Sequence, residues 1–282
     1  MNIQSAIIKG TNILKNKSIN SAKLDSEILL ASVIDKDRKY LILNNDQNIK
    51  EKNLIHFQKL INKRSFREPI AYLTNKKHFW NYKFFVTKDT LIPRPDTELI
   101  VEQILKLTKS KSKTKMKILD IGVGSGCILL TILKERKNFY GVGVDISKKC
   151  LNISKINAKN LEVSSRVKFF KSDVDKFDLG KYDLIVSNPP YIKKFNLKYL
   201  EKDVVNFEPK LALDGGLDGL SEIRKVITKS SELIKKNGKF ILEIGFDQKN
   251  KVINLLKDKG FYINSISKDL AKNDRCIVST KI

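Results

Sequence analysis

The first 75 residues alternate helical periodicity with short polar breaks. Apolar side chains in this part of the chain recur at intervals of three and four positions. The positions that share a face are Ile3, Ile7 and Leu14, then Leu24, Ile28 and Ala31, and then Leu54, Phe57 and Ile61. This spacing is typical of amphipathic helices. We therefore expect a small all-α domain over residues 1–77.

The pattern changes after this helical region. Residues 78–92, HFWNYKFFVTKDTLI, are rich in aromatic and β-branched side chains and predict a short linker hairpin. The following segment, IPRPDTELIVEQILKL, predicts a helix that is capped by Asp96 or Thr97. Its buried stripe would consist of Ile100, Ile104 and Leu107. The lysine- and serine-rich residues 108–115 are interpreted as a solvated loop.

From Met116 onward, segments with strand character alternate with helical ones. The predicted strands are KILDIG, FYGVGVDI, VKFFKSD, YDLIVSN, GKFILEIGF, FYINSIS and CIVSTKI, and helices are predicted from about Cys127, from about Ser147 and over residues 248–259. Such alternation predicts an α/β fold of Rossmann-like type, with a mostly parallel sheet covered by helices on both faces. Ligands of such sheets bind beyond the carboxyl ends of the strands, so candidate chemistry is expected there.

The composition is that of a globular protein. The chain has 282 residues, of which 41% are hydrophobic, which is enough for two domains with a substantial core. No apolar run reaches membrane-spanning length, and the N-terminal MNIQSAIIKG lacks the features of a signal peptide. We expect a cytoplasmic protein with no membrane partner, and we expect a monomer.

Few side chains are suited to metal binding or to nucleophilic catalysis. The three cysteines are widely spaced, and the only histidines are His56 and His78. This number and spacing disfavour a zinc site and a disulfide framework. Neither histidine lies near a nucleophile motif, which disfavours a Ser-His-Asp hydrolase. We expect no metal.

The net charge of +24 raises the question of a nucleic-acid partner. The basic excess is spread through both parts of the chain, and only 8 of the 55 basic residues are arginine, the side chain that most often contacts bases and phosphates. We interpret the lysine excess as a general compositional bias. A basic surface nevertheless attracts acidic partners.

A glycine-rich turn follows the first predicted strand. The sequence DIGVGSG, Asp120–Gly126, has the spacing G-x-G-x-G, which departs from the dinucleotide fingerprint because Cys127 stands where that pattern needs glycine. This spacing resembles the first motif of Rossmann-like methyltransferases, which bind S-adenosylmethionine. Glycine lets the backbone approach a ligand closely, and the carboxylate of Asp120 suits the positively charged end of this ligand. A pyrophosphate would be repelled by it.

Two further acidic residues follow the next two strands. Asp145 ends GVGVD and can accept hydrogen bonds from both ribose hydroxyls, whereas Asp173 ends the third strand and can meet the adenine amino group. Each of them could instead be only a helix cap. Their order, one per strand after the glycine turn, favours a nucleoside site.

The fourth strand delivers Asn188, Pro189, Pro190 and Tyr191 to the same edge of the sheet. The prolines lack backbone donors and hold their carbonyls rigidly. If the Asn188 side-chain oxygen and the Pro189 carbonyl accept the two hydrogens of a planar nitrogen, its lone pair points at the methyl donor. Tyr191 can pack over the flat group. The alternative is a proline-rich turn, and the motif alone suits base amines as well as side-chain amides.

Several motifs together resemble the HemK family, the bacterial release factor glutamine methyltransferases. They are REPIAYL, FW, LIPRPDTE, LDIGVGSG, SNPPYI and FEPKLALDGGLDGL, and they extend from about residue 64 to the C-terminus. The resemblance implies a class I S-adenosylmethionine-dependent methyltransferase domain over residues 93–282, and a helical release factor binding domain over residues 1–77.

The resemblance also implies an activity and a set of site residues. The implied reaction is methyl transfer to the side-chain amide nitrogen of the glutamine in the Gly-Gly-Gln loop of class 1 peptide chain release factors. The cofactor residues of the family correspond to Gly122, Val123, Gly124, Ser125, Gly126 and Asp145, and its substrate residues to Asn188, Pro189, Pro190 and Tyr191. The chain departs from the family in having Val174 after Asp173, where many members have an aromatic residue, and Asn75 at a usual glycine. Asn75 can also adopt a left-handed turn.

Other interpretations remain open from the sequence. Asn-Pro-Pro-Tyr and the charge also fit a nucleic-acid adenine N6-methyltransferase, but the chain has no long insertion for target recognition and only 8% aromatic residues, so no stable nucleic-acid partner is expected. A non-enzymatic module on the same scaffold is disfavoured by the intact motifs. Arg94 and Glu98 could be catalytic or could form a buried ion pair, and ALDGGLDG is interpreted as a turn at the substrate entrance.

Overall fold

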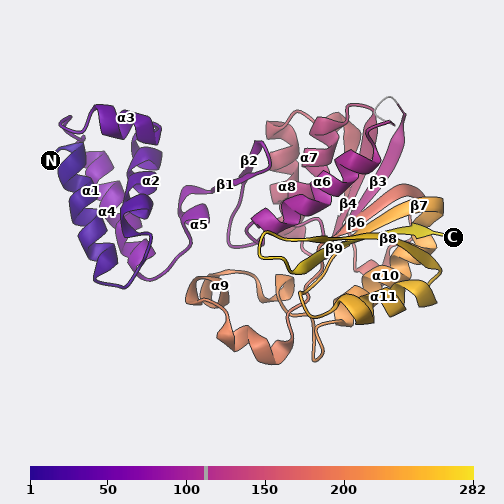
Figure 1. The fold of residues 1–282 in the computed structure, drawn as a ribbon. Helices are drawn as coiled ribbons and strands as arrows, with labels where there is room; N and C mark the ends of the chain where they lie inside the picture. Colours follow the sequence, from indigo (N-terminus) through magenta and orange to yellow (C-terminus); the bar gives the residue numbers. More distant parts are fainter. Residues whose placement is uncertain (111–113) are drawn as a thin grey trace. The chain divides into compact units, whose positions relative to one another are not determined.

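The computed structural model describes residues 1–110 and 114–282. Three residues of the predicted solvated loop, 111–113, lie outside this description. Within it, contacts divide the chain into two compact units. The first unit consists of residues 1–76 and 201–207, and the second of residues 77–200 and 208–282 (Figure 1).

The first unit is helical, as its periodicity predicts. Its helices are α1 (Ile3–Lys15), α2 (Ala22–Ile34), α3 (Arg38–Leu43), α4 (Glu51–Ser65), α5 (Ile70–Thr74) and α9 (Lys202–Phe207). Ile3, Leu14, Leu29, Phe57 and Ile61 are among the buried side chains of its core. Asn75 ends α5 in the left-handed conformation expected of it, with a φ of 53°.

The predicted apolar face of α2 is only partly correct. Ala31 is buried as predicted and Ile28 is half-buried, but Leu24 is 43% exposed. The buried face of the helix also includes Asp25 and Ser26 together with Leu29 and Leu30. Apolar periodicity identified another face because it assigns Asp25 to solvent, whereas this carboxylate is buried against a charged partner on α4.

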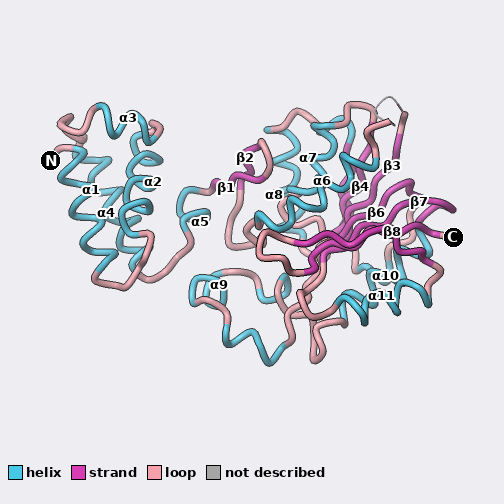
Figure 2. The backbone as a smooth tube through the Cα atoms, viewed as in Figure 1, coloured by secondary structure: helices cyan, strands magenta, loops and turns pink. Residues whose placement is uncertain are grey.

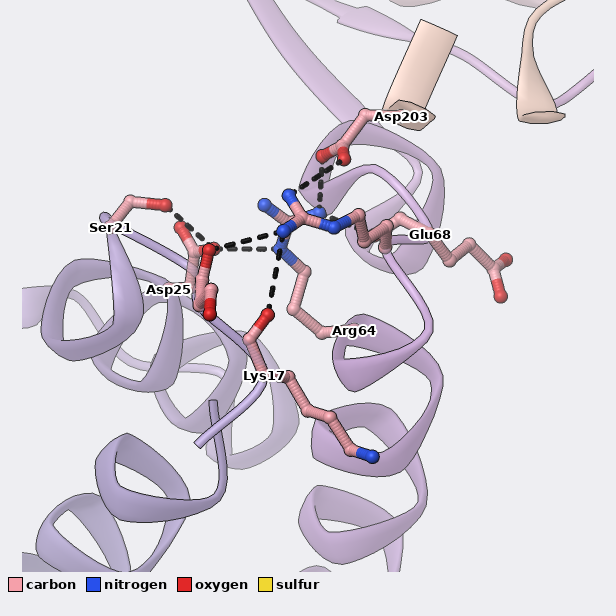
Figure 3. Close-up of polar contacts among 8 residues, drawn as sticks. Lys17, Ser21, Asp25, Arg64, Glu68 and Asp203 are labelled. Carbon is pink, nitrogen blue, oxygen red and sulfur yellow. Dashed lines mark hydrogen bonds and ion pairs between the residues drawn. The ribbon is translucent and has the colours of Figure 1, made fainter. Parts of the chain in front are cut away.

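That partner is Arg64, which is itself buried. Its Nε donates to Asp25 Oδ2 at 2.7 Å, and its Nη1 donates to Asp203 Oδ2 at 2.6 Å and to the Glu68 carbonyl at 3.2 Å (Figure 3). The Ser21 hydroxyl donates to Asp25 Oδ2 at 2.9 Å. One guanidinium thus joins α2, α4 and α9 within the first unit.

The second unit begins within a hairpin that is formed by β1 (Lys76–Phe79) and β2 (Tyr82–Phe85). The hairpin was predicted over residues 78–92, so the observed one starts earlier and ends sooner. The helix predicted next is α6 (Glu98–Leu107), and a 3₁₀ turn, Pro95–Thr97, precedes it. Ile100 and Ile104 are buried as predicted, whereas Leu107 is only half-buried. The predicted side-chain cap is absent at Thr97, because its hydroxyl is engaged in another part of the fold.

A seven-stranded sheet forms the centre of the second unit, in the order β5-β4-β3-β6-β7-β9-β8. Figure 2 shows strands in magenta. The strands are β3 (Met116–Ile121), β4 (Phe139–Asp145), β5 (Val167–Lys171), β6 (Tyr182–Ser187), β7 (Ile234–Glu243), β8 (Phe261–Lys268) and β9 (Asp274–Lys281). The first five in this order are parallel, and β9 pairs antiparallel with both β7 and β8. This confirms the mostly parallel α/β fold.

Helices cover both faces of the sheet (Figure 1). One face carries α6, α7 (Cys127–Glu135) and α8 (Lys148–Asn160), and the other carries α10 (Ser221–Leu233) and α11 (Lys249–Asp258). Helix α10 was not predicted. Its buried positions Ile223, Val226 and Ile227 have helical spacing, but no capping side chain marks its start.

The strand register brings several chain segments to one edge of the sheet. Ile121 of β3 is level with Val144 of β4 and with Ser187 of β6, and Ser187 is level with Leu242 of β7. The residues that follow these four positions therefore emerge together. Among the described residues, no helix is both long and apolar enough to cross a membrane.

Candidate active site

The glycine turn after β3 has a conformation that ordinary side chains rarely adopt. Gly122, Gly124 and Gly126 have φ values of +77°, +54° and +82°. The amides of Gly122 and Val123 both donate to the Val144 carbonyl, at 2.8 and 2.9 Å, which holds the turn against β4. A Cβ at Gly122 would meet no atom within 4 Å, so the space above this part of the turn is open. The turn is therefore a cradle that a ligand can approach.

Asp145 at the end of β4 contacts this turn directly. Its Oδ2 accepts from the Gly124 amide at 2.9 Å and its Oδ1 from the Ser147 amide at 2.8 Å. Burial raises the pKa of this carboxyl, and the two amides oppose that rise. The predicted cofactor residues Gly124 and Asp145 are thus brought together.

Asp120 lies directly below the turn and is fully buried. Within the described part of the chain, neither of its carboxyl oxygens has a partner that meets hydrogen-bond geometry. Burial raises the pKa of Asp120 to about 7; the nearby backbone amide of Leu129 opposes that rise, and the charge of Asp145 adds to it. A buried carboxyl without partners suits a cationic ligand group, since a nearby positive charge would stabilise its ionised form.

The raised pKa of Asp120 predicts a pH-dependent stability. Because the folded carboxyl holds its proton more tightly than the unfolded one, with its ordinary value of 3.8, stability is full below that value and is lost as the pH rises toward about 7. The slope is at most about 1.4 kcal/mol per pH unit for this carboxyl. Urea unfolding of the cofactor-free protein from pH 4 to 8, followed by Trp80 fluorescence, measures it.

The matched variants are Asp120→Asn, which should flatten this slope, and the exposed Asp46→Asn, which should leave it unchanged. A slope that Asp120→Asn does not alter would mean that another group titrates. Glu243 is the other buried carboxyl with a pKa raised to about 7, again mainly by burial, so part of the slope should survive in Asp120→Asn.

Asn188 emerges beside the glycine turn. The hydroxyl of Ser187 donates to the Ile121 carbonyl at 2.7 Å, which fixes the ends of β6 and β3 to each other. The Asn188 side-chain nitrogen donates to Thr97 Oγ1 at 3.1 Å. Pro189 is buried, whereas Asn188, Pro190 and Tyr191 are partly exposed.

Tyr191 is held at both of its polar ends. Its hydroxyl donates to Glu243 Oε1 at 3.2 Å, and its carbonyl accepts from the Gln248 side-chain nitrogen at 2.9 Å. Gln248 also donates to the Gly219 carbonyl, which ties the glycine-rich ALDGGLDG segment to this motif. The same segment pairs with Ile192, whose amide donates to the Leu213 carbonyl.

The side chain of Asp173 accepts a local hydrogen bond. Its Oδ1 accepts from the Asp175 amide at 3.2 Å and caps the 3₁₀ turn Val174–Lys176, which is the alternative role that the sequence allowed. Val174 packs against the core of the sheet. The adenine contact of Asp173 stays a prediction.

Arg94 and Glu98 have structural contacts. Arg94 Nη2 donates to Glu208 Oε1 at 2.5 Å, and the Ile92 amide donates to the other oxygen of this buried carboxylate at 3.1 Å. Glu98 Oε1 accepts from the Trp80 amide at 2.7 Å. These bonds join the LIPRPDTE segment to the FEP segment and to the hairpin. The structural contacts account for Arg94 and Glu98, so neither residue needs a catalytic role.

Sequence reasoning gave Thr97 only a possible capping role, and it missed Glu243 and Gln248. The signal for Glu243 was an acidic residue at the end of an apolar strand, FILE, which is the same signal that identified Asp120 and Asp145. The strand order was needed to recognise it, because β7 is adjacent to β6 only in the folded sheet.

The fold and the turn define a class I methyltransferase of Rossmann-like fold. A solved methyltransferase from Pyrococcus furiosus has the same fold, with a TM-score of 0.53 at 15% identity over 78% of this chain and 98% of that chain. The Methyltransferase small domain family matches residues 96–206, and the PrmC N-terminal domain family matches residues 5–74.

Full-length relatives identify the family. The release factor glutamine methyltransferase of Clostridium acetobutylicum is 38% identical over 100% of this chain and 99% of its own length. That of Buchnera aphidicola is likewise 38% identical with the same coverage. A bifunctional methyltransferase of Rickettsia conorii is 34% identical, and the match spans only 58% of that protein. The chain belongs to the release factor glutamine methyltransferase family.

Proposed function

We propose that the protein transfers a methyl group from S-adenosylmethionine to the side-chain amide nitrogen of the glutamine in the Gly-Gly-Gln motif of class 1 peptide chain release factors. The named relatives support this substrate. The observation that carries the proposal is the hydrogen bond from the Ser187 hydroxyl to the Ile121 carbonyl, because it fixes the strand end just before Asn188 to the strand end just before the glycine turn.

The residues of the turn fit S-adenosylmethionine. The open space above Gly122 admits a ligand against the backbone, and the partnerless carboxyl of Asp120 suits a positive charge. Asp145 still has lone pairs for ribose hydroxyls beyond its two backbone bonds. When bound, this cofactor supplies a methyl group on a positively charged sulfur.

The substrate half of the site acts by positioning. The nitrogen of a glutamine amide is a poor nucleophile because its lone pair is delocalised into the carbonyl. If its two hydrogens are donated to Asn188 Oδ1 and to the Pro189 carbonyl, the lone pair is directed toward the glycine turn. The prolines keep these acceptors rigid, and the Tyr191 ring offers a flat apolar surface for the amide.

Gly122→Ala should weaken S-adenosylmethionine binding by about tenfold or more. The added Cβ would occupy the open space above the turn, and its positive φ would add about 1–2 kcal/mol of strain. Calorimetric titration with the cofactor measures the affinity. Gly180→Ala is a matched control, because Gly180 also has a positive φ, of +83°, but lies away from the turn. Equal losses of affinity in both variants would contradict binding of the cofactor against the turn at Gly122.

We further expect the helical unit to dock on an acidic surface of the release factor, since the chain has a net charge of +24 and lysine predominates among its basic residues. We expect release factor binding to weaken several-fold between 50 and 300 mM salt, because screening shortens the range of charge attraction. Fluorescence anisotropy with a labelled release factor measures this. An affinity independent of salt would rule out electrostatic docking.

The direct test uses labelled S-adenosylmethionine with three acceptors in separate reactions. They are a class 1 release factor, the same factor with its Gly-Gly-Gln glutamine replaced by alanine, and a pool of DNA and RNA. The proposal predicts label in the intact factor alone. Label in the nucleic acids and none in the factor would establish the adenine methyltransferase alternative instead.

A further inference from the structure

A buried polar chain connects three separate sequence motifs behind the substrate half of the site. Asn188 Nδ2 donates to Thr97 Oγ1 at 3.1 Å. Burial raises the pKa of Glu243, and the Thr97 side chain opposes that rise, as a hydroxyl that faces the carboxyl does. The hydroxyl of Tyr191 donates to Glu243 Oε1 at 3.2 Å. Glu243 therefore contacts the Tyr191 end of the Asn-Pro-Pro-Tyr motif directly and acts on the Asn188 end through Thr97.

Glu243 is an unusual group in this position. It ends β7 and is 1% exposed, and within the described residues its Oε2 has no partner that meets hydrogen-bond geometry. Burying a carboxylate is costly, and apolar side chains would fill this position more easily. Packing therefore does not explain its presence.

The direction of the hydrogen bonds among Asn188, Thr97 and Glu243 follows from the number of protons that each group can donate. The Thr97 hydroxyl has one proton, and an ionised Glu243 can only accept. If Thr97 gives its proton to Glu243, only its lone pairs face Asn188, so the amide nitrogen of Asn188 must turn toward Thr97. The amide oxygen of Asn188 is then left for the substrate.

We infer that Thr97 and Glu243 are positioning residues that set the orientation of the Asn188 side-chain amide. This inference rests on the proposed function, in which Asn188 Oδ1 accepts a hydrogen from the substrate amide. A neutral side chain at position 243 can donate a hydrogen bond to Thr97, and Thr97 can then donate to Asn188. This favours the reversed amide orientation, in which Asn188 Oδ1 faces Thr97 and Nδ2 faces the substrate. The reversed amide presents its NH₂ group to the substrate NH₂ group, and the two repel each other.

The main test compares Thr97→Val, Thr97→Ser and Thr131→Val in steady-state methylation of a release factor by the full chain. Thr131 is also buried and its hydroxyl has no partner in the described structure, so Thr131→Val is the same chemical change without the contact. We expect Thr97→Val to lower kcat by about 10- to 100-fold. The KM values for both substrates should change less than about threefold. Thr97→Ser and Thr131→Val should retain kcat within about threefold.

The pH profile separates this role from a purely structural one. At saturating substrates kcat should fall below about pH 7, because burial raises the pKa of Glu243 to about 7 and the protonated carboxyl can donate. Glu243→Gln should have a low kcat at every pH, without this fall of kcat at acidic pH (the acidic limb). Other titratable or charged groups around Glu243 are Arg275, Asp96, Tyr191, Cys127 and Cys276. A limb that survives in Glu243→Gln belongs to another group, such as Asp120, and overturns the assignment.

A readout without catalysis is the exchange of the Asn188 side-chain NH₂ with solvent, followed by nuclear magnetic resonance. Exchange should be slow in the unaltered protein and in Thr97→Ser, and faster in Thr97→Val. The inference is overturned if folded Thr97→Val keeps its kcat, or if Thr97→Ser loses as much as Thr97→Val. If Thr97→Val does not fold, Thr97→Ser and Glu243→Gln still decide through kcat and the pH profile. Failure of the proposed function can be distinguished from failure of this inference, because in that case the unaltered protein itself would not label a release factor.

Discussion

Replacing Asn188 with alanine is expected to lower the turnover of release factor methylation by about 10²- to 10³-fold. This is the loss typical of deleting one preorganised polar contact at a reacting group. In the structure Asn188 stands beside the glycine turn, and its nitrogen is already bonded to Thr97, so its oxygen is the part available to a substrate. Single-turnover methylation with saturating cofactor measures the effect.

Two controls accompany this variant. Asn152→Ala alters an exposed asparagine on α8 and should have no effect on turnover. Calorimetry should show that Asn188→Ala still binds S-adenosylmethionine, with only a modest loss. Near-normal turnover in Asn188→Ala would mean that this asparagine only shapes the turn.

Arg64→Ala should destabilise the helical unit by about 3–5 kcal/mol. Removing one partner of a buried ion pair leaves the other charge uncompensated, and here Asp25 would remain buried with only the Ser21 hydroxyl. Hydrogen exchange of peptides from α2 and α4, measured by mass spectrometry on the full chain, reports the local free energy of opening. We expect protection to fall by about 10²- to 10⁴-fold.

Arg38→Ala is the matched control in the same unit. Arg38 donates to Glu27 at 2.6 Å, but its side chain is 51% exposed, so the loss should be below about 1 kcal/mol. Equal protection in Arg64→Ala and the unaltered chain would show that the buried pairs do not stabilise the helices.

The strands of the sheet were predictable because buried parallel strands have continuous apolar runs that end at polar residues. KILDIG and YDLIVSN show this directly, and both are strands at the predicted places. The face of α2 was only partly predictable, since its buried Asp25 depends on Arg64, which lies 39 positions away along the chain. Helix periodicity cannot reveal a buried charge whose partner is distant in sequence.

The candidate site, like the fold, was predictable in part. Gly124, Asp145 and Asn188 could be proposed because each follows a strand, and the fold gathers strand ends. Asp96 or Thr97 was predicted to cap α6, but the Thr97 hydroxyl accepts from Asn188 instead. A single hydroxyl can serve a local or a distant partner, and only the three-dimensional arrangement decides between them.

The most direct measurement is an experimental structure of the protein with bound S-adenosylmethionine and a Gly-Gly-Gln peptide. We expect the cofactor methyl group to face Asn188, with the glutamine nitrogen between them and its hydrogens directed at Asn188 Oδ1 and the Pro189 carbonyl. A methyl group that faces away from Asn188, or lies too far from it for one amide to bridge the gap, would contradict the proposed function.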